Sequence, residues 1–461
     1  MIHWDMLRTP EPEQTALEIV TLEELVCKDH LLRKIDAVID FSFIHELATP
    51  YYCLDNGRPP LDPTLMFKAL FLGYLFGIRS ERQLVREIAH NVAYRWFLRL
   101  KLTQNVFDAS TISANRRRRF DDSKIEQHIF DRIVEQAVGH GMVPGYILYT
   151  DSTHLKADAN KNRFTKDTIA KSRADYWDAL DADVALERAE RGLKPLPAKE
   201  REPNETVTRV STTDPDSGYM MREGKPEGFF YLDHRTVDSA YNIITDTHTT
   251  PANINDSRVY LGRLDRQVER FGFDVHAVGL DAGYATIPIA KGLVERDIMG
   301  VTGYRRPNPP ASGMMDKSRF IYNTHEDGYT CPNGQFLPYA STTREGYRQY
   351  RSDPKQCAKC PLLASCTSAK NQTREINRHI WQDDRDTINK NRLTPYGKKI
   401  YKRRQETVER SFADAKQLHG HRYARFRTLI RVQGQCLLAA ATQNIKKIAL
   451  EMIKTPKFSL A

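Results

Sequence analysis

The pattern of apolar and polar positions over the first 140 residues is helical in spacing. Asp62 followed by Pro63 is typical of a helix N-terminus, with the aspartate as N-cap, and predicts an apolar helix over 65–78. Ser80 begins a capping pattern that predicts the next helix. This part of the chain is therefore expected to be all-helical.

Two further helices are predicted, over 94–100 and over 110–138. The second of these contains four consecutive arginines: Arg116, Arg117, Arg118 and Arg119. The run is the best candidate in this region for contact with phosphate, with a solvated basic helix face as the alternative. Short helices joined by tight turns fit either a helix-turn-helix arrangement or an ordinary helical bundle.

Beyond residue 143 the pattern changes to strands. Residues 146–150 are an apolar run of strand length that ends at Asp151. Further strands are expected over 229–232, 236–239, 243–247, 275–280 and 298–302, and helices over 256–271 and 287–296. Between them, residues 160–205 form a charged insertion of helical character. Strands followed by alternating helices and strands predict an α/β fold with a mixed sheet.

Two acidic residues, Asp151 and Asp281, directly follow apolar strand-like runs. Functional groups emerge at the carboxyl ends of strands in α/β sheets. A carboxylate in that position is costly unless it is solvated, hydrogen-bonded or bound to a metal. Each one alone is more typical of a turn or N-cap aspartate, but two in matching contexts indicate a candidate site for a hard cation.

A third acid, Glu409, lies in a basic helical region. Residues 396–427 contain ten Lys or Arg against three acids. A solvated helix face usually interleaves both signs, so this excess of positive charge favours contact with phosphates. The whole chain of 461 residues has a net charge of +10, which agrees with a polyanionic partner.

Composition narrows the class of protein. An apolar content of 40% excludes wholesale disorder. Seven cysteines are too few for a secreted protein held together by disulfides, and an odd number cannot all be paired within the chain. Residues 1–14 show no signal-peptide pattern, and the apolar run over 65–78 is too short to span a bilayer. We therefore expect a soluble cytoplasmic protein with no membrane partner.

At this point the residues resemble a known family. Asp151, Asp281 and Glu409, with Tyr401, Arg404 and Lys416 around the glutamate, look like the core of bacterial insertion-sequence transposases of the DDE type. Further blocks resemble the same family in the same order: GRPPLDPTLMFKALFLGYLFGIRSERQLVREI, FDASTISANRRRRF, STTDPDSGYM, VDSAYNIITDTHTTPANINDS and DAGYA. The resemblance extends over nearly the whole chain and implies a ribonuclease-H-like fold.

The resemblance also implies the chemistry. Asp151, Asp281 and Glu409 would be the ligands of two Mg²⁺ (or Mn²⁺) ions, and such ions roughly 3.5–4 Å apart stabilise both oxygens of an in-line displacement at phosphorus. Tyr401, Arg404 and Lys416 would contact DNA. Glu409 and Lys416 have the family spacing, whereas Arg404 lies one residue farther from the glutamate than in the usual signature.

Four cysteines form a second group: Cys331, Cys357, Cys360 and Cys366. One tight C-x-x-C pair with two further thiols has the composition of a structural zinc site, although only one pair is tight. Free thiols and a disulfide pair are the alternatives. Members of the family similar to this chain carry a four-cysteine block at this place. The other three, Cys27, Cys53 and Cys436, are expected to be buried or half-buried small residues.

The predicted organisation has four parts: an N-terminal helical DNA-binding domain over 1–140, the first part of a ribonuclease-H-like core over 141–305, a zinc-ribbon-like four-cysteine insertion over 306–375, and the rest of the core over 376–461. The predicted function is a bacterial, nucleoid-associated transposase. It would bind the terminal inverted repeats of an element and target double-stranded DNA, as a homodimer, and cut and join strands. A DNA-binding derivative without activity and a nuclease that does not join are the alternatives.

Overall fold

The computed structural model describes residues 13–15, 17–53, 60–171, 174–197, 204–221, 224, 227–305 and 313–454. The expectation about a signal peptide falls almost wholly on residues outside this set, and so do residues 57–59 of the first family-like block. The chain divides into two compact units, residues 1–125 with 445–461 and residues 126–444. Among the described helices, none combines the length and the apolar composition that crossing a bilayer requires.

The described part of the first unit is helical. Its elements are α1 (Leu22–Leu25), α2 (Leu31–Val38), α3 (Phe43–Ala48), η2 (Thr49–Tyr51), α4 (Pro63–Leu75), α5 (Glu81–His90), α6 (Val92–Phe97), α7 (Ala109–Asn115), the π-helical turn η3 (Arg116–Phe120) and the end of α17 (Leu429–Met452). The expected caps are confirmed: Asp62 accepts from the N–H of Thr64, and Ser80 accepts from the N–H of Gln83. Helix α4 is buried on nearly all sides.

The prediction of a single helix over 110–138 is wrong. Helix α7 and turn η3 end at Phe120, and α8 (Ile125–Gly139) starts only after a turn. Lys124 in this turn has φ +54°, and the Ser123 hydroxyl accepts from the N–H of Ile125. The two aspartates before Ser123 favour such a turn, which the helical spacing of the apolar residues concealed.

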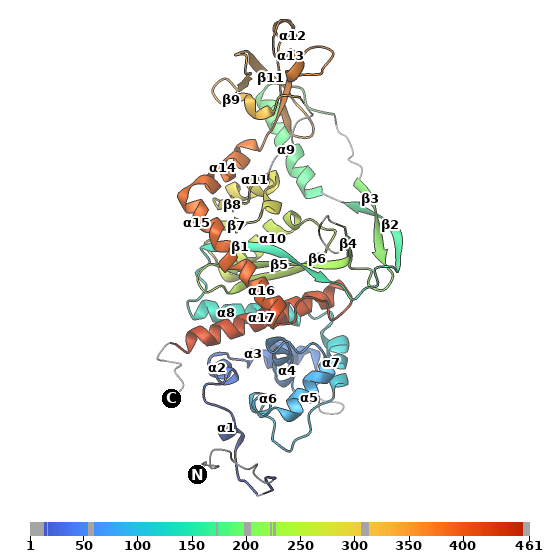
Figure 1. Ribbon diagram of the computed structural model, residues 1–461, viewed down its shortest axis with the longest axis vertical. Coiled ribbons are helices and arrows are strands. Elements are labelled where there is room, and N and C mark those ends of the chain that lie inside the picture. The colour runs from blue at the N-terminus through green and yellow to red at the C-terminus, as the bar shows by residue number, and fades with distance from the viewer. Residues whose placement is uncertain are drawn as a thin grey trace, which may run out of the picture. The chain divides into compact units, whose positions relative to one another are not determined.

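The core of the second unit is a six-stranded mixed sheet (Figure 1). Its strands are β1 (Ile147–Lys156), β4 (Gly218–Met220), β5 (Gly228–Asp238), β6 (Ile244–Pro251), β7 (Ala277–Leu280) and β8 (Met299–Thr302). The order is β4-β5-β1-β7-β8, with β6 also paired to β5. Strand β5 is antiparallel to β1 and β6, whereas β1, β7 and β8 run parallel. This is the ribonuclease-H-like mixed sheet that the sequence predicted; the two strands expected over 229–239 are one.

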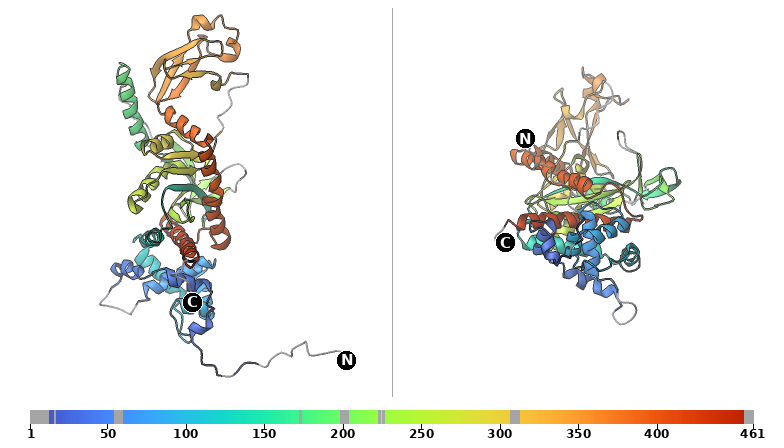
Figure 2. Two further views of the ribbon diagram at one scale, coloured as in Figure 1. Left: turned by 90° about the vertical axis from the view of Figure 1, so that its left-hand side faces the viewer. Right: turned by 60° about the horizontal axis from the view of Figure 1, so that its bottom comes forward.

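Helices cover both faces of the sheet, as Figure 2 shows in its left panel. One face carries α10 (Tyr260–Phe271) and α11 (Ile287–Glu295), and the other carries α15 (Pro395–Arg403) and α16 (Val408–Leu418). Gly279 of β7 lies on the second face, because a side chain there would meet Ile400 of α15 and the ring of Tyr149 in β1. Side chains alternate along a strand, so Asp151 and Asp281 lie on this same face.

Two insertions extend the core. The first comprises β2 (Phe164–Lys171), α9 (Ala174–Glu190) and β3 (Asn204–Ser211), so the charged stretch is helical only in its middle. The second, which contains the four cysteines, is an antiparallel sheet of β9 (Ile321–Asn323), β10 (Gly328–Thr330), β11 (Phe336–Thr342), β12 (Tyr347–Arg351) and β13 (Glu375–His379). Short helices α12 (Pro354–Cys357) and α13 (Leu363–Cys366) join β12 to β13, and α14 (Gln382–Leu393) follows.

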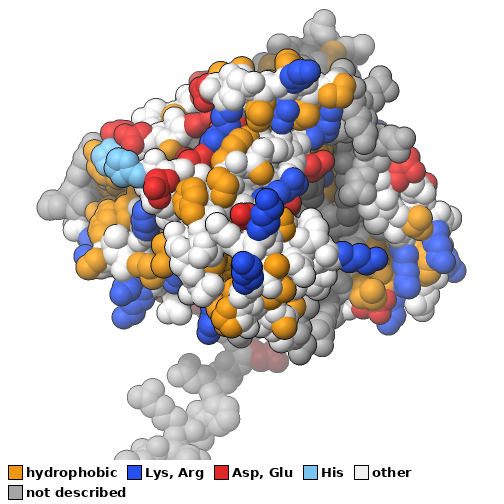
Figure 3. Space-filling view, turned by 90° about the horizontal axis from the view of Figure 1, so that it is seen from above, with side chains coloured by type: hydrophobic (Ala, Val, Ile, Leu, Met, Phe, Trp, Pro, Cys, Tyr) orange, Lys and Arg blue, Asp and Glu red, His pale blue; other side chains and the backbone are white. Residues whose placement is uncertain are grey.

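The surface of the second insertion is less basic than its sequence suggests. Arg348 pairs with Glu187 at 2.7 Å and Arg351 pairs with Glu375 at 2.9 Å, while Tyr350 is fully buried. Seen from above (Figure 3), Lys and Arg side chains are interspersed with hydrophobic and acidic ones rather than gathered into one patch.

Candidate active site

Strands β1 and β7 place Asp151 beside Asp281. The two strands are parallel, with Thr150 opposite Leu280, so the next residue of each chain segment is an aspartate. Neighbouring strands lie about 4.8 Å apart. The expectation that Asp151 lies past the end of its strand is wrong, because β1 continues to Lys156 through its pairing with β5. Its pairing with β7, however, ends at Thr150, so one edge of Asp151 is open toward Asp281.

The backbone after Asp281 turns sharply. Asp281 is the N-cap of the short helix η5 (Ala282–Tyr284), and its carboxylate accepts from the N–H of Gly283 at 2.7 Å. Tyr284 at the end of this turn is buried. Asp281 is therefore an N-cap aspartate, as one of the alternatives had it. Capping uses one carboxylate oxygen, and the remaining lone pairs can still bind another ligand.

Glu409 is the second residue of α16 and is 47% exposed. Between α15 and α16 the chain passes through a 3₁₀ turn, η7 (Arg404–Glu406), and Thr407, whose φ and ψ are −109° and −97°. In one continuous helix, residues five apart point in different directions, since each turn takes 3.6 residues. The break at Thr407 brings Arg404 and Glu409 to the same side, which explains how the extra residue in the signature is accommodated.

Arg404 lies between the carboxylates. It is 5% exposed, and its Nη2 donates to Oδ2 of Asp151 at 2.8 Å, while its Nη1 is 3.8 Å from Oε1 of Glu409. The pKa of Asp151 depends on its burial and on both charged neighbours. Burial raises this pKa to about 6, Arg404 opposes the rise, and Asp281 adds to it. Arg404 thus bridges Asp151 and Glu409, and Asp281 lies beside Asp151; we call these three acids the carboxylate site.

The other two residues of the signature lie close by. The Tyr401 hydroxyl packs against Gly303, where a side chain would approach it to 2.8 Å, and the Tyr401 ring is 5.5 Å from the Arg404 guanidinium. Lys416 is half-buried two turns after Glu409. Burial lowers its pKa, as do Arg422 and Arg235, whereas Asp233 and Asp151 act in the opposite sense. Both residues therefore border the carboxylate site.

A set of charged residues that the sequence reading missed lies next to this site. Asp233 and Arg235 on β5 are fully buried and paired at 2.9 Å, and Arg235 is opposite Asp151 in the strand register. His421 binds the same carboxylate at 2.8 Å, and the Cys436 sulfur is 3.9 Å from the His421 ring. We call Asp233, Arg235, His421 and Cys436 the buried cluster. The sequence did contain a sign of this cluster, because the charged residues Asp233 and Arg235 lie two positions apart in an otherwise largely apolar strand.

The buried cluster connects β5 to the glutamate helix. Arg235 lies over the Phe412 ring at 5.1 Å, and its Nη1 is 3.5 Å from the Ser411 hydroxyl. Ser411 and Phe412 both lie within one helical turn after Glu409 in α16. The cluster therefore supports the position of Glu409 relative to β1. His419 and His421, which follow the glutamate helix, are both buried, and His421 belongs to this cluster.

Among the described residues, Asp233, His421 and Cys436 are also the group of potential metal ligands whose ligand atoms all lie within 4.8 Å of one another. Two facts argue against a metal there. The Arg235 guanidinium already pairs with the Asp233 oxygen that His421 binds. Burial also raises the pKa of Cys436 well above its usual value, which disfavours the thiolate that a metal requires.

The four cysteines of the insertion line one small cavity of about 30 Å³ with Phe320 and Leu337. They lie close enough that Cys357, Cys331 and Cys360 raise the pKa of Cys366, although burial is the larger cause. No three of these sulfurs fall within 4.8 Å of one another in the described chain. Sulfur atoms around tetrahedral zinc would be about 3.8 Å apart, so they would have to move together to bind it. Cys27 and Cys53 are exposed, against expectation, whereas Cys436 is buried as expected.

The arginine run of the first unit divides into two pairs. Arg116 pairs with Glu81, and Arg119 binds Asn115 and lies 4.5 Å from the Tyr52 ring, so both have structural contacts. Arg117 and Arg118 are exposed. Arg117 donates to the backbone carbonyl of Ser113 at 3.3 Å, but its side chain stays exposed, so the exposed pair is the better placed to meet a phosphate.

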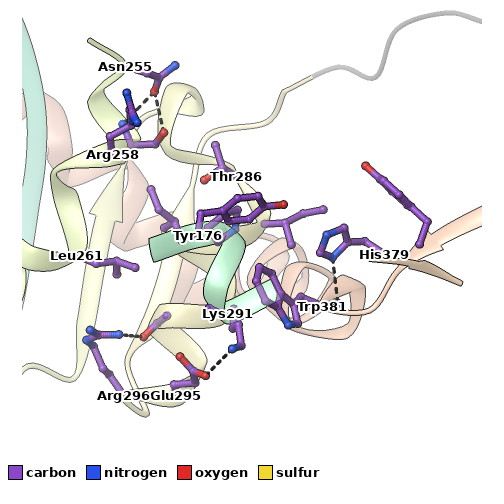
Figure 4. A pocket seen from close by; sticks show the side chains of 17 residues that line it. Tyr176, Asn255, Arg258, Leu261, Thr286, Lys291, Glu295, Arg296, His379 and Trp381 are labelled. Carbon is purple, nitrogen blue, oxygen red and sulfur yellow. Dashed lines mark hydrogen bonds and ion pairs between the residues drawn. The ribbon is translucent and has the colours of Figure 1, made fainter. Parts of the chain in front are cut away.

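A larger pocket, of about 750 Å³, lies elsewhere in the second unit (Figure 4). Residues of α9, α11 and the segment after β13 line it, among them Tyr176, Lys291 and Trp381. Its lysine is already paired, with Asp183 at 2.8 Å and Glu295 at 3.1 Å. None of the three acids of the carboxylate site lines this pocket, so it is not the place of the predicted chemistry.

Fold and carboxylates together define a ribonuclease-H-like protein with acids at the edge of its central strands. The family described as Transposase domain (DUF772) matches residues 20–118, and the family described as Transposase DDE domain matches residues 330–449. Both matches are to transposase families, and the second is to a DDE domain, so the chain carries the domains of a DDE-type transposase. It is therefore an enzyme of nucleic-acid cleavage, and a DDE domain uses divalent metal.

Other comparisons add little. No curated protein sequence matches the chain. A structural match was found to the piggyBac transposase, solved by cryo-electron microscopy in a synaptic complex with hairpin DNA. It has 12% identity and a TM-score of 0.34, and it covers 93% of this chain and 77% of that one. A score this low carries no inference about this chain.

Proposed function

We propose that this transposase binds the ends of a DNA element and catalyses metal-dependent strand cleavage and strand transfer at the carboxylate site. One observation carries the proposal. One buried guanidinium, Arg404, bridges Asp151 of β1 and Glu409 of α16, and Asp281, in the turn after β7, lies beside Asp151. Such a concentration of carboxylates supports the proposal, because hard cations prefer oxygen ligands.

Each residue has a role in this proposal. Asp151, Asp281 and Glu409 would hold Mg²⁺ or Mn²⁺, which supplies charge stabilisation to the attacking and leaving oxygens of an in-line displacement at phosphorus. Oxygen ligands suit these metals, and a partly exposed Glu409 leaves the site open to DNA. The attacking group is water in cleavage and a DNA 3′-hydroxyl in transfer.

Basic residues around the site would hold the DNA. Lys416, Arg404 and Tyr401 border the carboxylates and would contact the phosphates next to the reacting bond. In the N-terminal unit, Arg117 and Arg118 would bind the backbone of the element end, whereas Arg116 and Arg119 would maintain the helical unit. A homodimer would pair two element ends, inside a bacterial cell.

The test is a strand-transfer assay with labelled element ends. Asp151→Asn, Asp281→Asn and Glu409→Gln should each reduce cleavage by roughly a thousandfold or more, because each removes a ligand that stabilises charge in the transition state. End binding in a gel-shift assay should stay within about twofold. A purified Asp281→Asn protein that still cuts at the wild-type rate would refute the assignment.

The same assay separates the two alternatives. A DNA-binding protein without activity would show end binding and no cutting in the wild type. A nuclease without joining activity would cut the ends but give no strand-transfer product. Neither alternative has an observation in its favour, since all three acids are present.

We also propose one structural zinc ion at Cys331, Cys357, Cys360 and Cys366. Their shared cavity supports this proposal, and small closures of the sulfur positions would complete a four-thiolate site. Metal analysis of the purified protein should give one zinc per chain, and Cys360→Ser should lose it. The exposed Cys27 provides the matched control, since Cys27→Ser should retain the zinc. A wild-type protein with no zinc would refute the site.

A further inference from the structure

Arg404 lies between two of the three acids of the carboxylate site. Its guanidinium donates to Asp151 at 2.8 Å and lies 3.8 Å from Glu409, so it bridges two acids that come from different elements. It is 5% exposed and therefore held at this position by its surroundings. Its Nε atom has no hydrogen-bond partner in the described part of the chain. The cation thus interacts mainly through its two terminal nitrogens, which face the carboxylates.

A guanidinium and a divalent ion cannot share these oxygens without cost. The positive charges would lie only a few ångströms apart, where repulsion is strong in a partly buried site. Without any cation, on the other hand, the negative charges of Asp151 and Glu409 would repel each other. An arginine that bridges them offsets this repulsion.

We propose that Arg404 serves as a substitute cation in the metal-free protein and releases Asp151 and Glu409 when divalent metal binds. The freed guanidinium then faces the phosphates of bound DNA. This inference rests on the proposed function, because it requires that the carboxylate site bind metal. It goes further by giving Arg404 two successive partners and by making metal binding a competition with the protein's own side chain.

Neighbouring basic residues do not share this position. Arg403 is adjacent in sequence, but it is exposed and donates to the backbone carbonyl of Ser239 at 2.7 Å. Lys416 is half-buried and has no ion pair with Asp151 or Glu409 among the described contacts. Arg403 therefore offers a control that removes the same charge close by without touching the carboxylates.

The experiment measures Mn²⁺ binding to the full chain by calorimetry without DNA. Arg404→Met should bind Mn²⁺ at least about tenfold more tightly than the wild type, because the competing charge is gone. Arg404→Lys retains the charge and should give a smaller gain, and Arg403→Met should change the affinity by less than about twofold. DNA cleavage should fall in Arg404→Met in spite of the tighter metal binding.

Several outcomes overturn the inference. If Arg404→Met binds Mn²⁺ no more tightly than the wild type, Arg404 does not compete with metal. If Arg403→Met gives the same gain in Mn²⁺ affinity, the gain comes from the loss of a positive charge anywhere near the site and not from the position of Arg404. Should Arg404→Met fail to fold, Arg404→Gln, which can still donate to Asp151, takes its place with the same expectation. If the wild type binds Mn²⁺ and Asp281→Asn binds it equally well, the proposed carboxylate site itself fails, which is a separate result.

Discussion

The carboxylate site and the buried cluster are neighbours that use the same residue types for different purposes. Both pair an arginine with an aspartate, and strand register places Asp151 directly opposite Arg235. In the buried cluster one aspartate has three partners, from Arg235, His421 and Thr247. In the carboxylate site the ratio is reversed, since one arginine, Arg404, lies beside two acids, Asp151 and Glu409. An excess of acid over cation marks the site that needs an external ion.

The protonation behaviour of the two aspartates follows the same difference. Burial raises the pKa of both. In Asp233 the effects of Arg235 and His421 outweigh burial and hold the pKa below its usual value. In Asp151 burial prevails, and nearby Asp281 adds to it, so the pKa rises to about 6. The first aspartate is electrostatically satisfied and the second is not, which separates a structural network from a binding site.

Breaking the buried cluster should have the largest effect on stability. Arg235→Met leaves Asp233 charged and buried with one strong partner fewer, and should cost about 3–5 kcal/mol of unfolding free energy. Urea denaturation measures it. Arg410→Met is the control, because Arg410 pairs with Asp414 at 3.0 Å on the surface with its side chain 70% exposed, and should cost less than about 1 kcal/mol. Equal losses in the two variants would mean that the buried cluster is not structural.

Metal binding at the carboxylate site should depend on pH. Asp151 binds a metal only when it is ionised, and its pKa of about 6 means that it is mainly protonated at pH 5 and mainly ionised at pH 7. Affinity for Mn²⁺ should therefore rise with pH, by about tenfold between these values. Calorimetry at both pH values tests this. A constant affinity would show that Asp151 is not a ligand.

The smallest effect is expected for the stability of a carboxylate-site variant. Asp281→Asn retains a side chain that can cap η5 through the N–H of Gly283, so the unfolding free energy should change by less than about 1 kcal/mol. Thermal unfolding compared with the wild type gives the answer. A large loss of stability would show that Asp281 has a structural role, like the residues of the buried cluster, and would contradict the contrast between the two regions.

Local patterns predicted part of this molecule well. The caps at Asp62 and Ser80 and the strand before Asp281 depend on neighbouring residues, and the sequence carries their signals directly. The pairing of Asp151 with Arg235 is different, since 83 residues separate them in the chain and only the sheet register joins them. The same holds for the insertion at 321–379, whose short strands have too little apolar periodicity to be distinguished from loops.

The most direct test of the account is the location of bound Mn²⁺ in crystals of the wild-type protein, seen by anomalous scattering. The account predicts an anomalous peak among Asp151, Asp281 and Glu409, with Arg404 turned away from the carboxylates. A peak among Asp233, His421 and Cys436, with the carboxylate site empty, would contradict it.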